Sequence, residues 1–207
     1  ASCSDSGESS GSESFGNAED WNDETYDDRR QDINAVLESL NSLNSNNQQL
    51  KGVMDASKVG GLGHSLGGYT MLGLAGGWSS WKDGRIEAVA LMSPYSEPFS
   101  LSGDLESVNI PVMHQGGTLD GGITPTLDEV DDALSGEKYC GILQGVGHFG
   151  WTNSKCSSYS SVEQCINGDS AAKTINKYVV AMFDNNLKGE QQSLLTSNSG
   201  FKSYEHS

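Results

Sequence analysis

A serine between glycines, in the sequence Gly63-His64-Ser65-Leu66-Gly67, is the residue best placed to act as a nucleophile. The pattern Gly-x-Ser-x-Gly marks a nucleophile elbow, a sharp strand-to-helix turn that presents the serine hydroxyl. Serine and glycine are abundant here, so the pattern alone is weak, but a predicted strand at 58–63 and a predicted helix at 66–75 supply its context. We predict that Ser65 is a nucleophile and that the Leu66 amide, at the helix N-terminus, donates to an oxyanion. The alternative is a glycine-rich turn without a chemical role.

A serine hydroxyl becomes a good nucleophile only when a base takes its proton. Of the four histidines, His148 alone lies in a glycine-rich loop directly after a predicted strand, in the sequence Gly145-Val146-Gly147-His148-Phe149-Gly150. That position is the carboxyl edge of a sheet, where sites form in α/β proteins. We expect His64 to point away from the serine, while His114 lies within a predicted strand and His206 on the C-terminal tail. We therefore predict that His148 is the base; the alternative is an ordinary surface histidine.

The base needs a carboxylate that fixes its tautomer and stabilises its charged form. Asp120 follows the predicted strand at 110–115 on a second glycine-rich loop, so it also lies at the carboxyl edge. Three rival carboxylates are less well placed, because they lie on a predicted helix face or follow a different strand: Asp128, Asp104 and Glu97. We predict that Asp120 orients His148, and the alternative is a carboxylate that only caps its loop.

The elements that must position these residues alternate along the chain. Short apolar runs predict strands at 58–63, 86–93, 110–115 and 139–144. Apolar residues at helical spacing predict helices at 28–44, with Asp28 as a candidate N-cap, at 66–75, around 127–134, and from an Asp169 N-cap onwards. This alternation predicts an α/β fold, a parallel sheet of about four recognisable strands flanked by helices.

Composition divides the chain into three predicted segments. Residues 1–27 are acidic and rich in serine and glycine, and we expect them to be poorly ordered or docked only locally. Residues 28–187 form the α/β domain, and 188–207 form a polar tail. The 28 acidic against 12 basic residues give a net charge of −16, which excludes a general nucleic-acid binder because such proteins need cationic surface. No apolar run approaches the roughly 18–20 residues that a membrane span needs.

We expect no metal and no other cofactor. The run Asp20-Trp21-Asn22-Asp23-Glu24 is acidic enough for calcium, but it lacks the glycine and the spaced glutamate of an EF-hand loop. The four cysteines show no zinc-site spacing; their even number favours two disulfides and an extracellular or periplasmic location. Cys156 and Cys165 flank a short polar loop and are the first predicted pair, and Cys3 with Cys140 follows by elimination.

Three stretches together resemble one group of esterases: the elbow Gly-His-Ser-Leu-Gly-Gly, the stretch Gly-Gly-Thr-Leu-Asp-x-Gly-Ile-Thr-Pro, and Gly-His-Phe-x-Trp-Thr. This group is the α/β-hydrolase branch with platelet-activating-factor acetylhydrolase-like, dienelactone hydrolase-like and cutinase-like members. The resemblance runs from about Tyr26 to Phe183 and includes Arg29-Arg30-x-Asp32. It implies a serine carboxylic-ester hydrolase acting on a small ester or lipid, with Ser65, Asp120 and His148 in the triad positions. Dienelactone hydrolases proper have a cysteine nucleophile, so the serine departs from them.

The resemblance also implies strands that this sequence does not show. In the family the elbow follows the fifth of eight strands, and an earlier loop gives the second oxyanion donor. Here an acidic, strand-poor segment precedes the helix at 28–44, so that donor is not located, and a fragment, a processed piece and a reduced fold all stay open. We expect a second polypeptide or a homo-oligomer to cover the strand at 58–63.

The alternative function is a non-catalytic remnant or binding module.

Two aromatic residues are candidates for the substrate site. Trp151 lies just past His148 and Tyr95 follows the strand at 86–93, although each could instead only pack.

Overall fold

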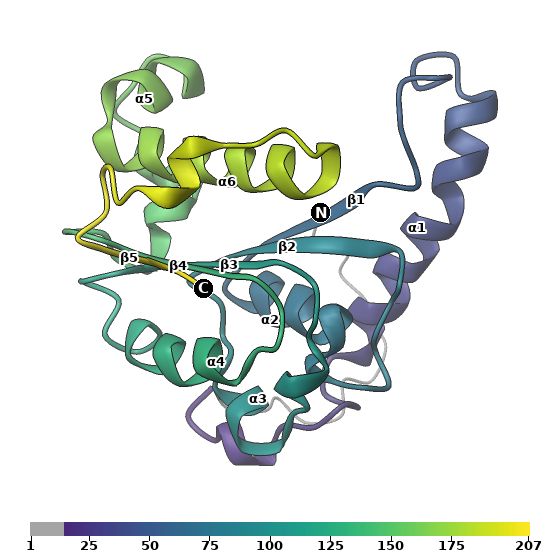
Figure 1. Ribbon diagram of the computed structural model, residues 1–207, viewed down its shortest axis with the longest axis horizontal. Coiled ribbons are helices and arrows are strands. Elements are labelled where there is room, and N and C mark those ends of the chain that lie inside the picture. The colour runs from purple at the N-terminus through teal and green to yellow at the C-terminus, as the bar shows by residue number, and fades with distance from the viewer. Residues whose placement is uncertain (1–14) are drawn as a thin grey trace.

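The computed structural model describes residues 15–207, which form one five-stranded sheet with helices on both faces (Figure 1). The strands are β1 (Val59–His64), β2 (Ile86–Met92), β3 (Val112–Gly117), β4 (Lys138–Leu143) and β5 (Ser203–His206). They lie in the order β1-β2-β3-β4-β5; the first four are parallel and β5 is antiparallel to β4. The α/β fold class is confirmed, and each predicted strand agrees with an observed one to within two residues at either end.

The helices form two layers around this sheet. They are α1 (Asp27–Asn46), α2 (Leu66–Leu72), α3 (Glu97–Ser102), α4 (Leu127–Ala133), α5 (Val162–Gly168) and α6 (Ser170–Lys188). Figure 1 shows α5 and α6 on one face, α2, α3 and α4 on the other, and α1 beside β1. Within residues 15–207, no helix is both long enough and apolar enough to cross a bilayer.

The central strand β2 is apolar on both sides because both of its faces are covered. Ala88 and Ala90 pack in the cluster that contains Tyr178 and Met182 of α6, whereas the alternate residues of β2 pack with the α2 side. Asp169 caps α6 as predicted, since its side chain accepts a hydrogen bond from the Ala172 amide at 2.8 Å.

The predicted cap of the first helix is wrong. The N-cap of α1 is Tyr26, in the left-handed region at φ 59°, and Asp28 lies inside the first turn. Acidic side chains are favourable at the N-cap, where they accept hydrogen bonds from free amides, and also in the first turn, where they interact with the helix dipole. An acidic residue near a helix start therefore does not by itself identify the N-cap. The segment 66–75, predicted as one helix, contains two different helical elements. It is α2 followed by a π-helical turn, Gly73–Gly77, in which Gly76 has φ 127°.

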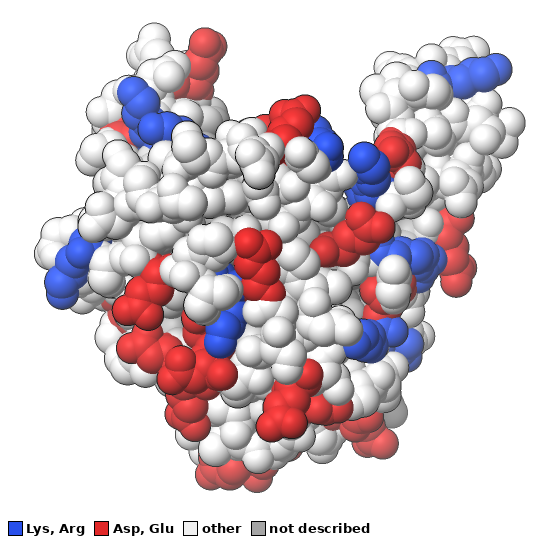
Figure 2. Space-filling model, in the orientation of Figure 1, with Lys and Arg blue, Asp and Glu red and all other residues white. Residues whose placement is uncertain are grey.

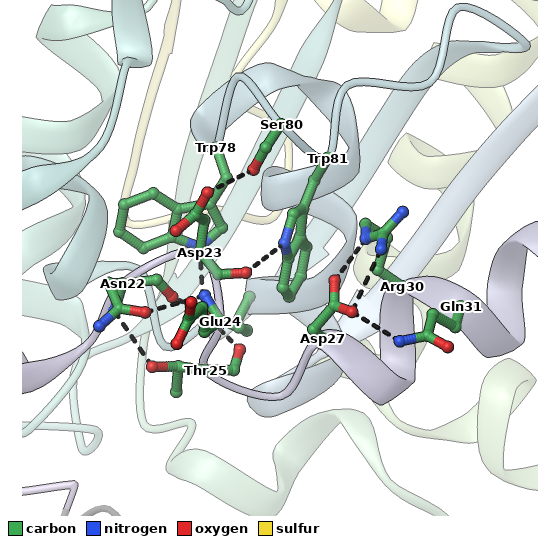
Figure 3. Close-up of polar contacts among 11 residues, drawn as sticks. Asn22, Asp23, Glu24, Thr25, Asp27, Arg30, Gln31, Trp78, Ser80 and Trp81 are labelled. Carbon is green, nitrogen blue, oxygen red and sulfur yellow. Dashed lines mark hydrogen bonds and ion pairs between the residues drawn. The ribbon is translucent and has the colours of Figure 1, made fainter.

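The acidic N-terminal segment is docked where the structure describes it. Trp21 is only 1% exposed, and its ring packs against four others: Phe15, Tyr26, Tyr69 and Tyr95. Nearby, Trp81 Nε1 donates to the Asp23 carbonyl at 2.7 Å, and Ser80 Oγ donates to the Asp23 carboxylate at 2.7 Å (Figure 3). The sequence predicted either poor order or local docking for residues 1–27; residues 15–27 are docked in this way, and residues 1–14 lie outside the described residues.

The acidic run 20–24 does not form a metal site in this structure. Among the described residues, no three His, Cys, Asp or Glu side chains are grouped so that they could hold a metal ion. The Asp23 carboxylate is instead engaged by Ser80.

The predicted polar tail contains a strand that the sequence analysis missed. β5 pairs with β4, and Phe201 and Tyr204 pack their rings against Tyr178 of α6. The strand is short and carries Ser, Glu and His, so it has no apolar run to mark it. Aromatic contacts made across the fold hold this segment in place.

One predicted disulfide is confirmed, and it joins Cys156 to Cys165 with a Cα–Cα distance of 5.4 Å. Cys140 is a buried thiol of β4 with no disulfide partner among residues 15–207; Cys3, its predicted partner, lies outside the described residues, so that pairing stays a prediction. Pairing by elimination uses an even count and contains no distance, so it gave no geometric test of the second bridge.

We expect a Cys156→Ser/Cys165→Ser double variant to lose about 2–3 kcal/mol of unfolding free energy, because an open loop of this size has more conformational freedom in the unfolded chain. Urea unfolding of oxidised wild type and variant measures the difference. Wild type in excess reductant is the control and should match the variant. Equal midpoints for all three samples would contradict the prediction.

Candidate active site

The turn between β1 and α2 has the geometry of a nucleophile elbow. Ser65 has φ 54° and ψ −119°, a conformation that costs free energy for a residue other than glycine. Three backbone hydrogen bonds hold it: the Ser65 amide donates to the Met92 carbonyl, and the Ser65 carbonyl accepts from the amides of Tyr69 and Tyr95, each at 3.1 Å. The surrounding sheet and helix thus impose the strained turn.

Two glycines allow the close approach of strand and helix at this turn. A Cβ on Gly63 would lie 2.1 Å from the Gly67 carbonyl oxygen, and a Cβ on Gly68 would lie 2.5 Å from Pro94 Cβ. A Cβ on Gly67 would meet no atom within 4 Å outside its own helix and chain neighbours. Gly68, which follows the Gly-x-Ser-x-Gly motif, is therefore more tightly constrained by its surroundings than Gly67, the last residue of the motif.

The structure brings together the three residues that the sequence predicted. His148 Nε2 lies 2.9 Å from Ser65 Oγ, and His148 Nδ1 lies 2.8 Å from Asp120 Oδ2. Asp120 is 6% exposed, on the loop after β3, and His148 begins a 3₁₀ turn after β4. With a proton on Nδ1, the imidazole donates to the carboxylate and leaves Nε2 free to accept the serine proton.

The rival carboxylates lie elsewhere and have other partners. Asp128 is on α4 and lines a pocket with two further acidic residues of that helix; Figure 2 shows acidic side chains gathered in this region. Asp104 accepts hydrogen bonds from Ser79 and Ser107. Glu97 is the first residue of α3.

His64 makes a contact that the sequence did not predict. Its Nε2 lies 2.7 Å from the His148 carbonyl oxygen, and its ring lies 4.8 Å from the His148 ring. Burial is the largest cause that lowers the pKa of His64, although the bond to that carbonyl acts in the other direction. The neutral ring, with its proton on Nε2, therefore donates to the loop that carries His148.

Ser93 is the second contributor that the sequence analysis missed. It follows β2 directly, has φ 44°, and is fully buried. Its Oγ hydrogen-bonds Asp120 Oδ2 and lies 3.0 Å from His148 Nδ1. The only signal in the sequence is its position at the carboxyl end of a central parallel strand, the same edge from which Asp120 and His148 come.

The other predicted residues lie close by. Leu66 is the first residue of α2, so its amide has no acceptor within the helix and can donate to an anion above Ser65. Trp151 is half-buried, with its Nε1 donating to Gln115 Oε1 at 3.1 Å and its ring stacked 6.3 Å from that of His64. Trp151 thus lies beside the ring that contacts the triad histidine.

Tyr95 has a packing role in this structure. It is 4% exposed, its hydroxyl donates to the Phe15 carbonyl at 2.8 Å, and burial is the largest cause that raises its pKa, to about 12. The phenol therefore stays neutral and ties the N-terminal segment to the elbow.

Comparison with known proteins leaves the family open. No protein-family model matches the chain, and no curated protein matches it. The geometry of Ser65, His148 and Asp120 and the sequence motifs around them are therefore the basis for a functional proposal.

The lowered pKa of His64 predicts a pH effect on stability. As pH falls below the unfolded value of about 6.5, the unfolded chain takes up a proton at His64 before the folded protein does, so this residue lowers the unfolding free energy. We expect His64→Phe to remove this contribution and to give a shallower loss of stability between about pH 6.5 and 5. The slope attributable to one proton is at most about 1.4 kcal/mol per pH unit.

Urea unfolding across this range measures both slopes. The range from about pH 7.5 to 8.5 serves as the internal control, because His64 is neutral there in both states and the two slopes should coincide. Parallel curves at acidic pH would refute the assignment.

Proposed function

We propose that this protein is a serine carboxylic-ester hydrolase. The observation that carries the proposal is the continuous chain of hydrogen bonds from Ser65 Oγ through both ring nitrogens of His148 to Asp120. A strained elbow that presents the serine at a helix N-terminus supports the same chemistry. The resemblance to the acetylhydrolase-like and cutinase-like esterases agrees in the order of the three residues along the chain.

The proposed reaction has two stages. Ser65 Oγ attacks the ester carbonyl carbon as its proton passes to His148 Nε2, and the oxygen that becomes negative accepts a hydrogen bond from the Leu66 amide. The intermediate collapses, and the departing alkoxide takes the proton from His148. Water then attacks the acyl-serine as His148 accepts its proton. When this second intermediate collapses, the acid product leaves and His148 returns the proton to Ser65 Oγ. Asp120 stabilises the imidazolium in both stages.

An apolar acyl or alkyl group suits the surroundings of the triad. Leu119 precedes Asp120 and is 70% exposed, while Phe149 follows His148 and is 68% exposed. Such side chains favour a small ester or a lipid over a charged polymer. The Cys156–Cys165 bridge fits an oxidising compartment, so we place the enzyme outside the cytoplasm, in an extracellular or periplasmic setting.

The second candidate function is a non-catalytic protein that keeps the elbow. The observation in its favour is that only one oxyanion donor, the Leu66 amide, is assigned, whereas the esterases that the sequence resembles use two.

Hydrolysis of a chromogenic short-chain ester distinguishes the esterase from the non-catalytic protein. We expect turnover by wild type and a loss of at least about 10³-fold in Ser65→Ala and in His148→Ala, because removing a triad member leaves only binding and oxyanion stabilisation. Circular dichroism checks that each variant is folded. No turnover by folded wild type would reject the esterase.

We also propose that another polypeptide pairs with β1. Among residues 15–207, β1 pairs only with β2, so its outer edge carries backbone groups that a strand can bond. Exposed apolar side chains occur on β1, on α1 and in the loop between them, as Leu62 is 52%, Val36 55% and Val53 72% exposed. A separate strand-bearing piece is preferred over a second copy, because it would also supply the second oxyanion donor.

We expect light scattering to find a species heavier than the single chain, and mass spectrometry to identify either a second polypeptide or this chain alone. Leu62→Lys should weaken the association, because a charge on an edge strand opposes pairing. Leu101→Lys is the matched control, since Leu101 is 54% exposed but lies on α3. A fully active, monodisperse wild-type monomer would overturn the proposal.

A further inference from the structure

We propose that Ser93 is a positioning residue that holds Asp120 and His148 in register, so that the site works as a network of four side chains. The inference rests on the proposed function for its effect on turnover, while its structural part stands on geometry alone. It concerns a residue that the predicted triad does not include.

The backbone directs Ser93 to this position at a cost. Its left-handed conformation, φ 44°, is uncommon for a residue other than glycine and persists only where the surroundings impose it. The Ser93 amide donates to the Gln115 carbonyl at 2.7 Å, which holds the residue against β3. The following residue, Pro94, packs closely against Gly68 of α2. Sheet and helix thus force the turn that aims the hydroxyl at Asp120.

The hydroxyl is suited to both of its neighbours. It has one proton and two lone pairs. The proton is donated to Asp120 Oδ2, which also accepts the proton of His148 Nδ1 at 2.8 Å. A lone pair of Ser93 Oγ, 3.0 Å from that same nitrogen, shares the imidazole proton. Asp120 Oδ2 is thereby fixed by two donors, and the imidazolium that forms during turnover has two acceptors.

Ser93 is fully buried, so water does not replace its hydroxyl when it is removed. Loss of a hydrogen bond to a charged group inside a protein corresponds to about a 10- to 100-fold change in rate when the bond supports the transition state. We expect Ser93→Ala to lower kcat by this factor and to leave KM within about two-fold.

Ser96→Ala is the matched control. Ser96 is also fully buried, and its Oγ has no hydrogen-bond partner within the described residues, so we expect unchanged kcat and KM. A fall in both variants would indicate a general packing effect and would overturn the proposal, as would a Ser93→Ala enzyme within two-fold of wild type.

A rescue experiment distinguishes positioning from packing. Asp120→Ala should be nearly inactive, and adding Ser93→Asp should restore at least about ten-fold. Aspartate tolerates the left-handed conformation, and its carboxylate would reach His148 Nδ1 from the end of β2. A double variant that is folded but no more active than Asp120→Ala would overturn the proposal.

The low-field NMR signal of the His148 Nδ1 proton, assigned by its loss in His148→Ala, tests the contact without activity. We expect Ser93→Ala to shift this signal and Ser96→Ala to leave it in place. A shifted signal in a protein that hydrolyses no ester would reject the proposed function but keep the contact. An unshifted signal would reject the contact, whatever the activity.

Discussion

The close approach of β1 and α2 at Ser65 is the constraint on which the rest of the site depends. A strand can turn into a helix this sharply because Gly63 has no side chain to meet the backbone of Gly67, and Gly68 leaves room for Pro94 after β2. The strained serine is then held by backbone bonds from β2 and α2. Because the turn cannot relax without breaking these bonds, the serine hydroxyl stays at the carboxyl edge of the sheet.

The parallel sheet brings the other groups to the same edge. The strands β1, β2, β3 and β4 run in one direction, so the segments that follow them meet at one end: Ser65, Ser93, Asp120 and the His148 loop. Four neighbouring strands therefore each contribute one side chain to a single network. His64 adds a bond to the His148 carbonyl, which ties the last of these loops back to the first strand.

Packing near both ends of the described residues, 15–207, supports this arrangement from outside. The Trp21 ring and the Tyr95 hydroxyl hold the N-terminal segment against the base of the elbow. At the other end, Phe201 and Tyr204 dock on α6, and β5 covers the edge of β4. The chain itself thus supplies the antiparallel edge strand β5 beside β4, while β1 is the other edge within the described residues.

From the sequence alone we predicted the four parallel strands and the three residues that the structure brings within hydrogen-bond distance, Ser65, His148 and Asp120. Strand-sized apolar runs and glycine-rich loops are local features, and a residue just after a parallel strand has its place at the carboxyl edge once the strand is known. Ser65, Asp120 and His148 could therefore be predicted from their positions after predicted strands. The bridge between Cys156 and Cys165 could be predicted from the short loop that separates them.

Only the tertiary structure decided the remaining contacts. Ser93 and His64 act through bonds to residues 27 and 84 positions away, and no local pattern reports such bonds. Trp21 and the strand β5 lie in polar segments whose order depends on aromatic rings from elsewhere in the chain. Composition and periodicity describe neighbours in sequence, whereas burial and hydrogen bonding of isolated side chains depend on neighbours in space.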